Sequence, residues 1–172
     1  MRRIAVTFLT LLLLWTLVTQ LSHTLTGFHV YLFVGGLCIA YAALMLPLRD
    51  GLLASALAGL LHDATTPVYF GTHLMLFATA HVIVYHLRDR MPREETTVRI
   101  LVALFANLGI FLLLSFAQIH RIPAPAAVWP RLIVDLACSQ IFVALVAPWF
   151  FALQTRALVL VGVERDALAP PP

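Results

Sequence analysis

The sequence predicts an all-α, polytopic membrane protein, a bundle of six transmembrane helices with the N- and C-termini in the cytoplasm. Of the 172 residues, 62% are hydrophobic and 11% are charged, and the mean hydropathy is +0.96. A soluble domain carries about 25% charged residues. The apolar residues form six runs, and most arginines lie in alternate segments between them. The formal charge of +3 is spread over loop ends, so we expect contact with membrane lipid and not with nucleic acid.

The first two apolar runs are interpreted as retained spans. Residues 4 to 21 follow two arginines, and no small-x-small cleavage site comes after them, which argues against a signal peptide. The second run, residues 28 to 46, contains Gly36 and Ala40, which share one helix face and allow a second helix to approach closely. Pro47 ends this run.

The third run, residues 51 to 61, has small residues along one helix face. Gly51, Ser55, Gly59 and Asp63 recur every fourth residue, so on a helix they form one stripe of three small residues and a carboxylate. In lipid such a stripe admits another backbone, and we expect it to bind a helix of a partner protein. At about 1.5 Å per residue the run is roughly 16 Å long, against about 30 Å of hydrocarbon. A short full span and a re-entrant half-helix both remain open at this point.

The arginine distribution favours a full crossing of the third run. The remaining spans are predicted over residues 69 to 87, 98 to 118 and 132 to 153. With six crossings nine of the eleven arginines are cytoplasmic, whereas only five are if the third run does not cross. The chain then divides into a six-span membrane domain, residues 1 to 156, and a short cytoplasmic tail, residues 157 to 172, which ends in three prolines and is expected to be flexible.

Two carboxylates, Asp63 and Asp135, fall within apolar runs, where ionisable groups are costly. Asp135 follows Arg131 by one helical turn, which indicates an ion pair that anchors the helix end. Asp63 has two open interpretations: it caps the backbone where its helix ends, or it contacts a partner or ligand. His73 and His81 are too far apart along one helix to share a metal, so we expect hydrogen bonds between helices.

No nucleophile elbow, phosphate loop or metal-ligand spacing occurs in the sequence. We therefore predict no catalytic residue, no cofactor and no metal. The more specific residues are Gly59, Asp63 and Gly71 after a short loop, and Pro148 in the last span belongs to the same pattern, whereas His62 beside the aspartate departs from it. This pattern resembles the rod shape-determining protein MreD family, and the resemblance extends loosely over residues 1 to 156.

The resemblance implies a non-enzymatic scaffold of the bacterial cell-wall elongation complex, in the cytoplasmic (inner) membrane. Its expected partners are an MreC-like bitopic membrane protein, a RodA-like glycan polymerase with its class B transpeptidase and, indirectly, the MreB actin homologue. The span layout is also similar to the S-component-like fold of energy-coupling-factor vitamin transporters. The alternative function is therefore a vitamin-binding S-component, which would need a polar pocket around His62, Asp63 and His73.

Overall fold

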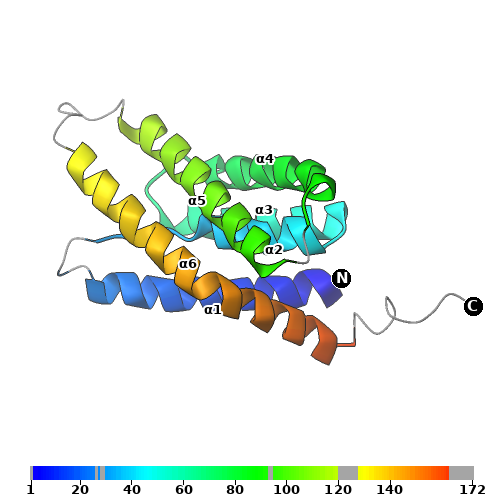
Figure 1. Ribbon diagram of the computed structural model, residues 1–172. Coiled ribbons are helices and arrows are strands. Elements are labelled where there is room, and N and C mark those ends of the chain that lie inside the picture. The colour runs from blue at the N-terminus through cyan, green and yellow to red at the C-terminus, as the bar shows by residue number, and fades with distance from the viewer. Residues whose placement is uncertain (1, 26, 28–29, 93–94, 120–127, 163–172) are drawn as a thin grey trace, which may run out of the picture.

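The computed structural model describes residues 2–25, 27, 30–92, 95–119 and 128–162. The regular elements in these ranges are all helices, which confirms the all-α prediction (Figure 1). The short α2 lies at the centre, in contact with α3, α4, α5 and α6. The elements, in chain order, are α1 (Arg2–Leu25), α2 (Gly35–Met45), α3 (Leu48–Thr65), α4 (Thr72–Leu87), the 3-10 turn η2 (Arg88–Arg90), α5 (Thr96–Ile119) and α6 (Trp129–Leu160).

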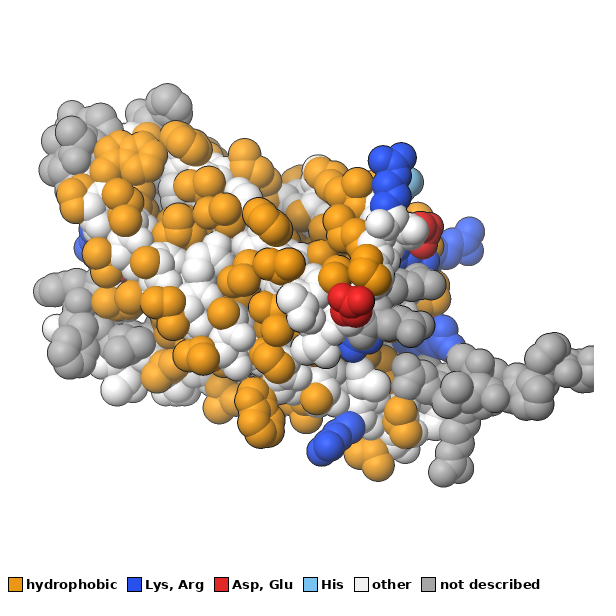
Figure 2. Space-filling view, in the orientation of Figure 1, with side chains coloured by type: hydrophobic (Ala, Val, Ile, Leu, Met, Phe, Trp, Pro, Cys, Tyr) orange, Lys and Arg blue, Asp and Glu red, His pale blue; other side chains and the backbone are white. Residues whose placement is uncertain are grey.

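Three of the helices are long and apolar enough to cross a membrane: Arg2–Thr24 in α1, Thr96–Ile119 and Trp129–Leu160. The helices α2, α3 and α4 are shorter, with 11, 18 and 16 residues. In Figure 2, hydrophobic side chains cover the middle of the visible face, and most of the visible Lys and Arg side chains gather toward the end where α1 begins. This distribution is that of a protein whose sides face lipid and whose charged end faces water.

Consecutive helices run in opposite directions, so the bundle has two ends. At one end α3 finishes and α4 begins, with the rings of His62 and His73 5.7 Å apart, and α5 meets the start of α6 through Phe116 and Trp129. This end is called the His62 end. At the other, the Arg88 end, α1, α3 and α5 begin and α2, α4 and α6 finish (Figure 1).

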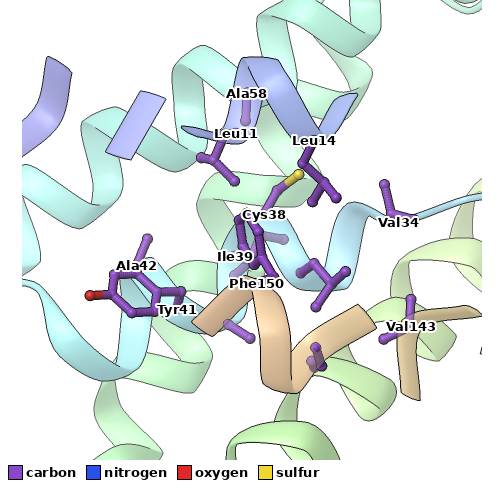
Figure 3. Close-up of a cluster of buried hydrophobic side chains, with 14 of the residues drawn as sticks. Leu11, Leu14, Val34, Cys38, Ile39, Tyr41, Ala42, Ala58, Val143 and Phe150 are labelled. Atoms are coloured by element: carbon purple, nitrogen blue, oxygen red, sulfur yellow. The ribbon is translucent and has the colours of Figure 1, made fainter. Parts of the chain in front are cut away.

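The core of the bundle is built around α2. Every residue from Gly35 to Leu44 is buried, which is possible because residues 30 to 48 contain no Asp, Glu, Lys or Arg. Figure 3 shows side chains of α1 and α6 converging on α2, among them Leu11 and Phe150 near Cys38. A helix that is apolar on all sides is stable only when other helices cover it completely.

The predicted helix over residues 28 to 46 is wrong in its first part, because residues 30–34 are not helical and α2 begins only at Gly35. Outside a helix, the backbone N–H groups of this segment must find hydrogen-bond partners elsewhere in the protein. The amide of Tyr31 donates to Asp135 Oδ1 at 2.9 Å. The amide of Phe33 donates to Ser139 Oγ at 2.9 Å, one turn further along α6.

Two other predicted bounds change. The third run lies in a continuous helix, Leu48–Thr65, which at 1.5 Å per residue is about 27 Å long and extends beyond residues 51 to 61 at both ends. The last helix extends to Leu160, so the first residues of the predicted tail are helical. Residues 163 to 172 of that tail lie outside the described residues.

Arg88 closes the C-terminal end of α2. Its Nη1 donates to the carbonyl oxygen of Leu46 at 2.9 Å and to that of Ala43 at 3.4 Å, and its guanidinium lies 3.7 Å from the centre of the Tyr85 ring. The last carbonyls of a helix have no partner within the helix and carry partial negative charge. Arg88 therefore satisfies these carbonyls and fastens the end of α4 to the core helix.

Replacing Arg88 by methionine is expected to lower the free energy of unfolding by about 1–2 kcal/mol, because two charged hydrogen bonds and a cation–π contact are lost. The matched control is Arg90→Met, since Arg90 is exposed in the same turn. Reversible unfolding of the purified protein in detergent measures both. Equal stability of the two variants would contradict the capping role of Arg88.

Candidate functional site

Asp63 joins the end of α3 to the start of α4. Its Oδ2 accepts the N–H groups of Gly71 at 3.0 Å and Leu74 at 3.1 Å. Its Oδ1 accepts the backbone N–H of His73 at 2.8 Å and the ring Nδ1 of His73 at 2.9 Å. The first N–H groups of a helix have no partner within the helix, and a carboxylate is the acceptor that the positive end of the dipole favours. Asp63 therefore has a structural role as a backbone cap, but the helix that it caps is the following one, α4, and not the end of its own helix.

Gly71 makes this cap possible. It is the residue before α4, and its φ is 95°, in the left-handed region. A Cβ at Gly71 would meet nothing within 4 Å, so a side chain would not collide with a neighbour. It would be unfavourable because residues with a Cβ rarely adopt this backbone conformation. The chain reverses at Gly71 and presents its N–H groups to Asp63.

The small-residue stripe faces helices of the same chain. Gly51, Ser55 and Gly59 are buried. A Cβ at Gly59 would lie 2.7 Å from Leu74 Cα, and a Cβ at Gly51 would lie 2.6 Å from Ala42 O. The expectation that this stripe receives a partner's helix is corrected, because α4 and α2 already cover it. Close approach of backbones does occur at the stripe, but within one chain.

Gly36 and Ala40 have the same kind of role. A Cβ at Gly36 would collide with the carbonyl oxygen of Ala103 and lie 2.5 Å from Asn107 N, so α5 packs directly on the backbone of α2. Asn107 Oδ1 also accepts the Gly36 N–H at 3.1 Å, and Ala40 is fully buried. This face too is closed to a partner. Pro148 lies half-buried inside α6 and removes one N–H from that helix.

Ser55 and His81 form a contact that the sequence did not predict as a pair. Ser55 Oγ lies 3.0 Å from His81 Nδ1, and both residues are 0% exposed. A hydroxyl beside an imidazole is the arrangement of a nucleophile and its base. Neither side chain lines any of the cavities described below, and the His81 ring lies against Gly51. In the described part of the chain this pair is a packing contact between α3 and α4, the hydrogen bonding expected of His81.

The His62 end contains a partly open cavity of about 410 Å³. This volume lies within the range of about 300–1,000 Å³ of small-molecule sites. It is formed between α1, residues 31–34 before α2, the ends of α3 and α5 and the start of α6. Its lining comprises Trp15, Val18, Thr19, Ser22, Tyr31, Leu32, Phe33, Val34, His62, Thr65, Thr66, Pro67, Val68, His73, Phe111, Leu114, Ser115, Gln118, Ile119, Val128, Leu132 and Asp135.

The polar wall of this cavity differs in part from the pocket that the S-component alternative requires. His62 and His73 line it, whereas Asp63 does not, because its carboxylate is used by the cap. Asp135 lines it, with Oδ2 4.0 Å from Arg131 Nε, so the predicted ion pair is present but long. The role of Asp135 toward the Tyr31 amide was missed, because nothing in the sequence indicates an unpaired amide at residue 31.

A second, almost entirely apolar hollow of about 430 Å³ lies between α4 and α5 and is called the α4–α5 groove. Gly109 is exposed in it, and a Cβ there would meet nothing within 4 Å. The groove is lined by Leu76, Thr79, Ala80, Ile83, Val84, Leu87, Met91, Val102, Phe105, Ala106, Gly109, Ile110 and Leu113.

No family model matches this chain, and no curated protein or solved structure is significantly similar to it. The function is therefore argued from the residues and contacts of the chain itself.

Proposed function

We propose that the protein is a non-enzymatic scaffold subunit of the bacterial cell-wall elongation complex, an MreD-like protein of the inner membrane. The observation that carries the proposal is the unit formed by Gly59, Asp63 and Gly71. These residues carry the resemblance to the MreD family, and they form one contiguous junction in which α3 packs on α4 and caps it. A set of residues that serves only to hold two helices together suits a protein whose task is to present surfaces to partners.

The proposed topology has six spans and cytoplasmic termini. Seven of the eight described arginines lie on segments at the Arg88 end, and Arg131 lies at the His62 end. This supports a cytoplasmic Arg88 end by the positive-inside rule. The seven are Arg2, Arg3, Arg49, Arg88, Arg90, Arg99 and Arg156.

The α4–α5 groove is the proposed contact for the single span of the MreC-like partner. The stripe on α3 and the face of Gly36 are already covered by the chain itself. The groove presents small residues, Thr79, Ala106 and Gly109, between two helices, where a foreign helix can come close to the backbone. Its lining carries no charged residue, as a span in lipid requires.

Replacing Gly109 by leucine tests the function and the groove together. The protein is expected to remain folded, since the added side chain meets open space, while recovery of the MreC-like protein with the tagged full chain from membranes falls about tenfold. Ala117→Leu is the matched control, an exposed small residue of the same helix outside the groove. Cells that depend on the Gly109 variant are expected to lose rod shape.

The outcomes separate the two parts of the proposal. Recovery that is unchanged by Gly109→Leu contradicts the groove alone. If the unaltered chain recovers neither the MreC-like protein nor the RodA-like polymerase, and its depletion leaves cell shape and wall synthesis intact, the scaffold function itself is wrong.

A further inference from the structure

The cavity at the His62 end contains two buried imidazoles, each with one nitrogen that has no protein partner. His62 Nδ1 lies 3.0 Å from the carbonyl oxygen of Ala58, and His73 Nδ1 lies 2.9 Å from Asp63 Oδ1. Both partners are acceptors, so each Nδ1 carries a hydrogen, and the Nε2 of a ring without a second hydrogen is an acceptor. His62 and His73 are 4% and 2% exposed, and neither Nε2 has a hydrogen bond among the described residues.

Other groups of the lining can also accept hydrogen bonds. Asp135 adds a carboxylate, and the hydroxyl of Thr66 donates its hydrogen to the carbonyl oxygen of His62 at 2.7 Å, which leaves its oxygen free to accept. The lining contains no lysine and no arginine. An anionic ligand would find no positive side chain in the lining and would lie near the carboxylate of Asp135, whose pairing with Arg131 is long at 4.0 Å.

Apolar residues make up much of the remaining wall, and three helices contribute to it. Val18 of α1, Phe111 and Leu114 of α5, and Leu132 of α6 provide a surface for a hydrocarbon or ring system. No group of three or more His, Cys, Asp or Glu within the described ranges is placed to hold a metal ion, which leaves the two imidazoles as hydrogen-bond acceptors. The cavity therefore combines apolar surface with the acceptor nitrogens of two imidazoles and the carboxylate of Asp135.

We propose that this cavity binds an amphipathic molecule whose polar end is a hydrogen-bond donor, a primary ammonium or a hydroxyl group. The donor end lies against the Nε2 atoms of His62 and His73, and the apolar part lies along Phe111, Leu114 and Leu132. Neither Nε2 is among the fully buried unpaired atoms of the described residues, so both can be reached from the cavity that the two rings line, and a donor of the ligand can bind them there. This site is separate from the α4–α5 groove, so the proposal does not depend on the scaffold function.

Three probes with one hydrocarbon chain and different polar ends test the chemistry. Decylamine, decanol and decanoate are each titrated into the full-length protein in detergent, and binding is followed by the rise in melting temperature. Decylamine and decanol are expected to bind, and decanoate is expected to bind at least about tenfold more weakly, as the loss of one or two hydrogen bonds implies. Equal affinity for all three, preference for decanoate or no binding overturns the proposal.

The variant His62→Phe keeps an aromatic ring beside Phe33 and Phe77 and removes the acceptor. It is expected to weaken decylamine and decanol binding about tenfold. The matched control is His86→Phe. The Nδ1 of His86 also contacts the carbonyl oxygen four residues earlier, at 2.8 Å, but His86 is exposed and outside the cavity.

A second variant, Leu132→Trp, fills the cavity without removing a polar group, so the test stands even if His62→Phe fails to fold. The site is contradicted if decylamine and decanol still bind to Leu132→Trp. It is also contradicted if His62→Phe and His86→Phe weaken their binding equally. Native mass spectrometry of the protein as purified identifies the natural source. The proposal is supported if an ethanolamine lipid, a soluble amine or a polyol co-purifies with the unaltered protein and is absent from Leu132→Trp. A soluble vitamin as the co-purifying ligand is the result that the S-component alternative requires. An anionic adduct lost in the same variant overturns the proposal.

Discussion

Replacing Gly59 by leucine is expected to prevent α3 from packing on α4 and to remove most of the folded protein. Even the first carbon of the new side chain would lie 2.7 Å from Leu74 Cα and 2.8 Å from Leu74 N, and these atoms are backbone that cannot rotate away. Overpacking in a core costs about 1–3 kcal/mol where side chains can adjust, and more is expected where backbone must move. Displacement of α4 would also break the cap at Asp63.

The measurement is the amount of protein in the membrane and its melting temperature after extraction. The same substitution at Gly109, where a Cβ meets nothing within 4 Å, is the matched control and is expected to give normal amounts of folded protein. Normal abundance and stability of Gly59→Leu would mean that α3 and α4 do not approach each other as described.

Asp63→Ala is the second change with a large expected effect, a loss of about 3–5 kcal/mol of stability. The three backbone N–H groups at the start of α4, those of Gly71, His73 and Leu74, lose their acceptor, as does the ring of His73. Each buried donor left unpaired costs about 1–3 kcal/mol, and part of this is recovered if water or a neighbouring group reaches it.

Unfolding in detergent measures this loss, with Asp89→Ala as the control. The side chain of Asp89 is 76% exposed, 3.6 Å from Arg88 Nε, and a surface ion pair contributes less than about 1 kcal/mol. Asp63→Asn is expected to fall between the two, because it keeps one carbonyl oxygen as an acceptor. Equal stability of Asp63→Ala and Asp89→Ala would show that the carboxylate does not hold α4.

The long apolar helices could be predicted closely because polar and charged residues mark the ends of their apolar runs. The span expected over residues 98 to 118 is α5, Thr96–Ile119, since a continuous apolar run of that length has no other stable form in lipid. The cap at Asp63 was one of two interpretations, because a carboxylate at a helix end can accept hydrogen bonds from any nearby backbone.

Other features depend on partners that are distant in the sequence. A stripe of small residues predicts that some backbone comes close, but not whether it belongs to the same chain, and for Gly51 and Gly59 it does. The non-helical residues 30–34 are as apolar as the helix that follows, so hydrophobicity alone does not predict where the helix begins. The Ser55–His81 contact joins residues 26 positions apart and has no local signal.

The hydrogen bonds of residues 31 and 33, before α2, also affect how the chain folds during synthesis. The acceptor for the Tyr31 amide is Asp135, which is synthesised 104 residues later, and the acceptor for Phe33 follows after 106 residues. Lipid offers no substitute acceptor for these amides. These two hydrogen bonds can therefore form only after α6 has been synthesised, and a chain truncated before Asp135 is expected to be less stable in the membrane.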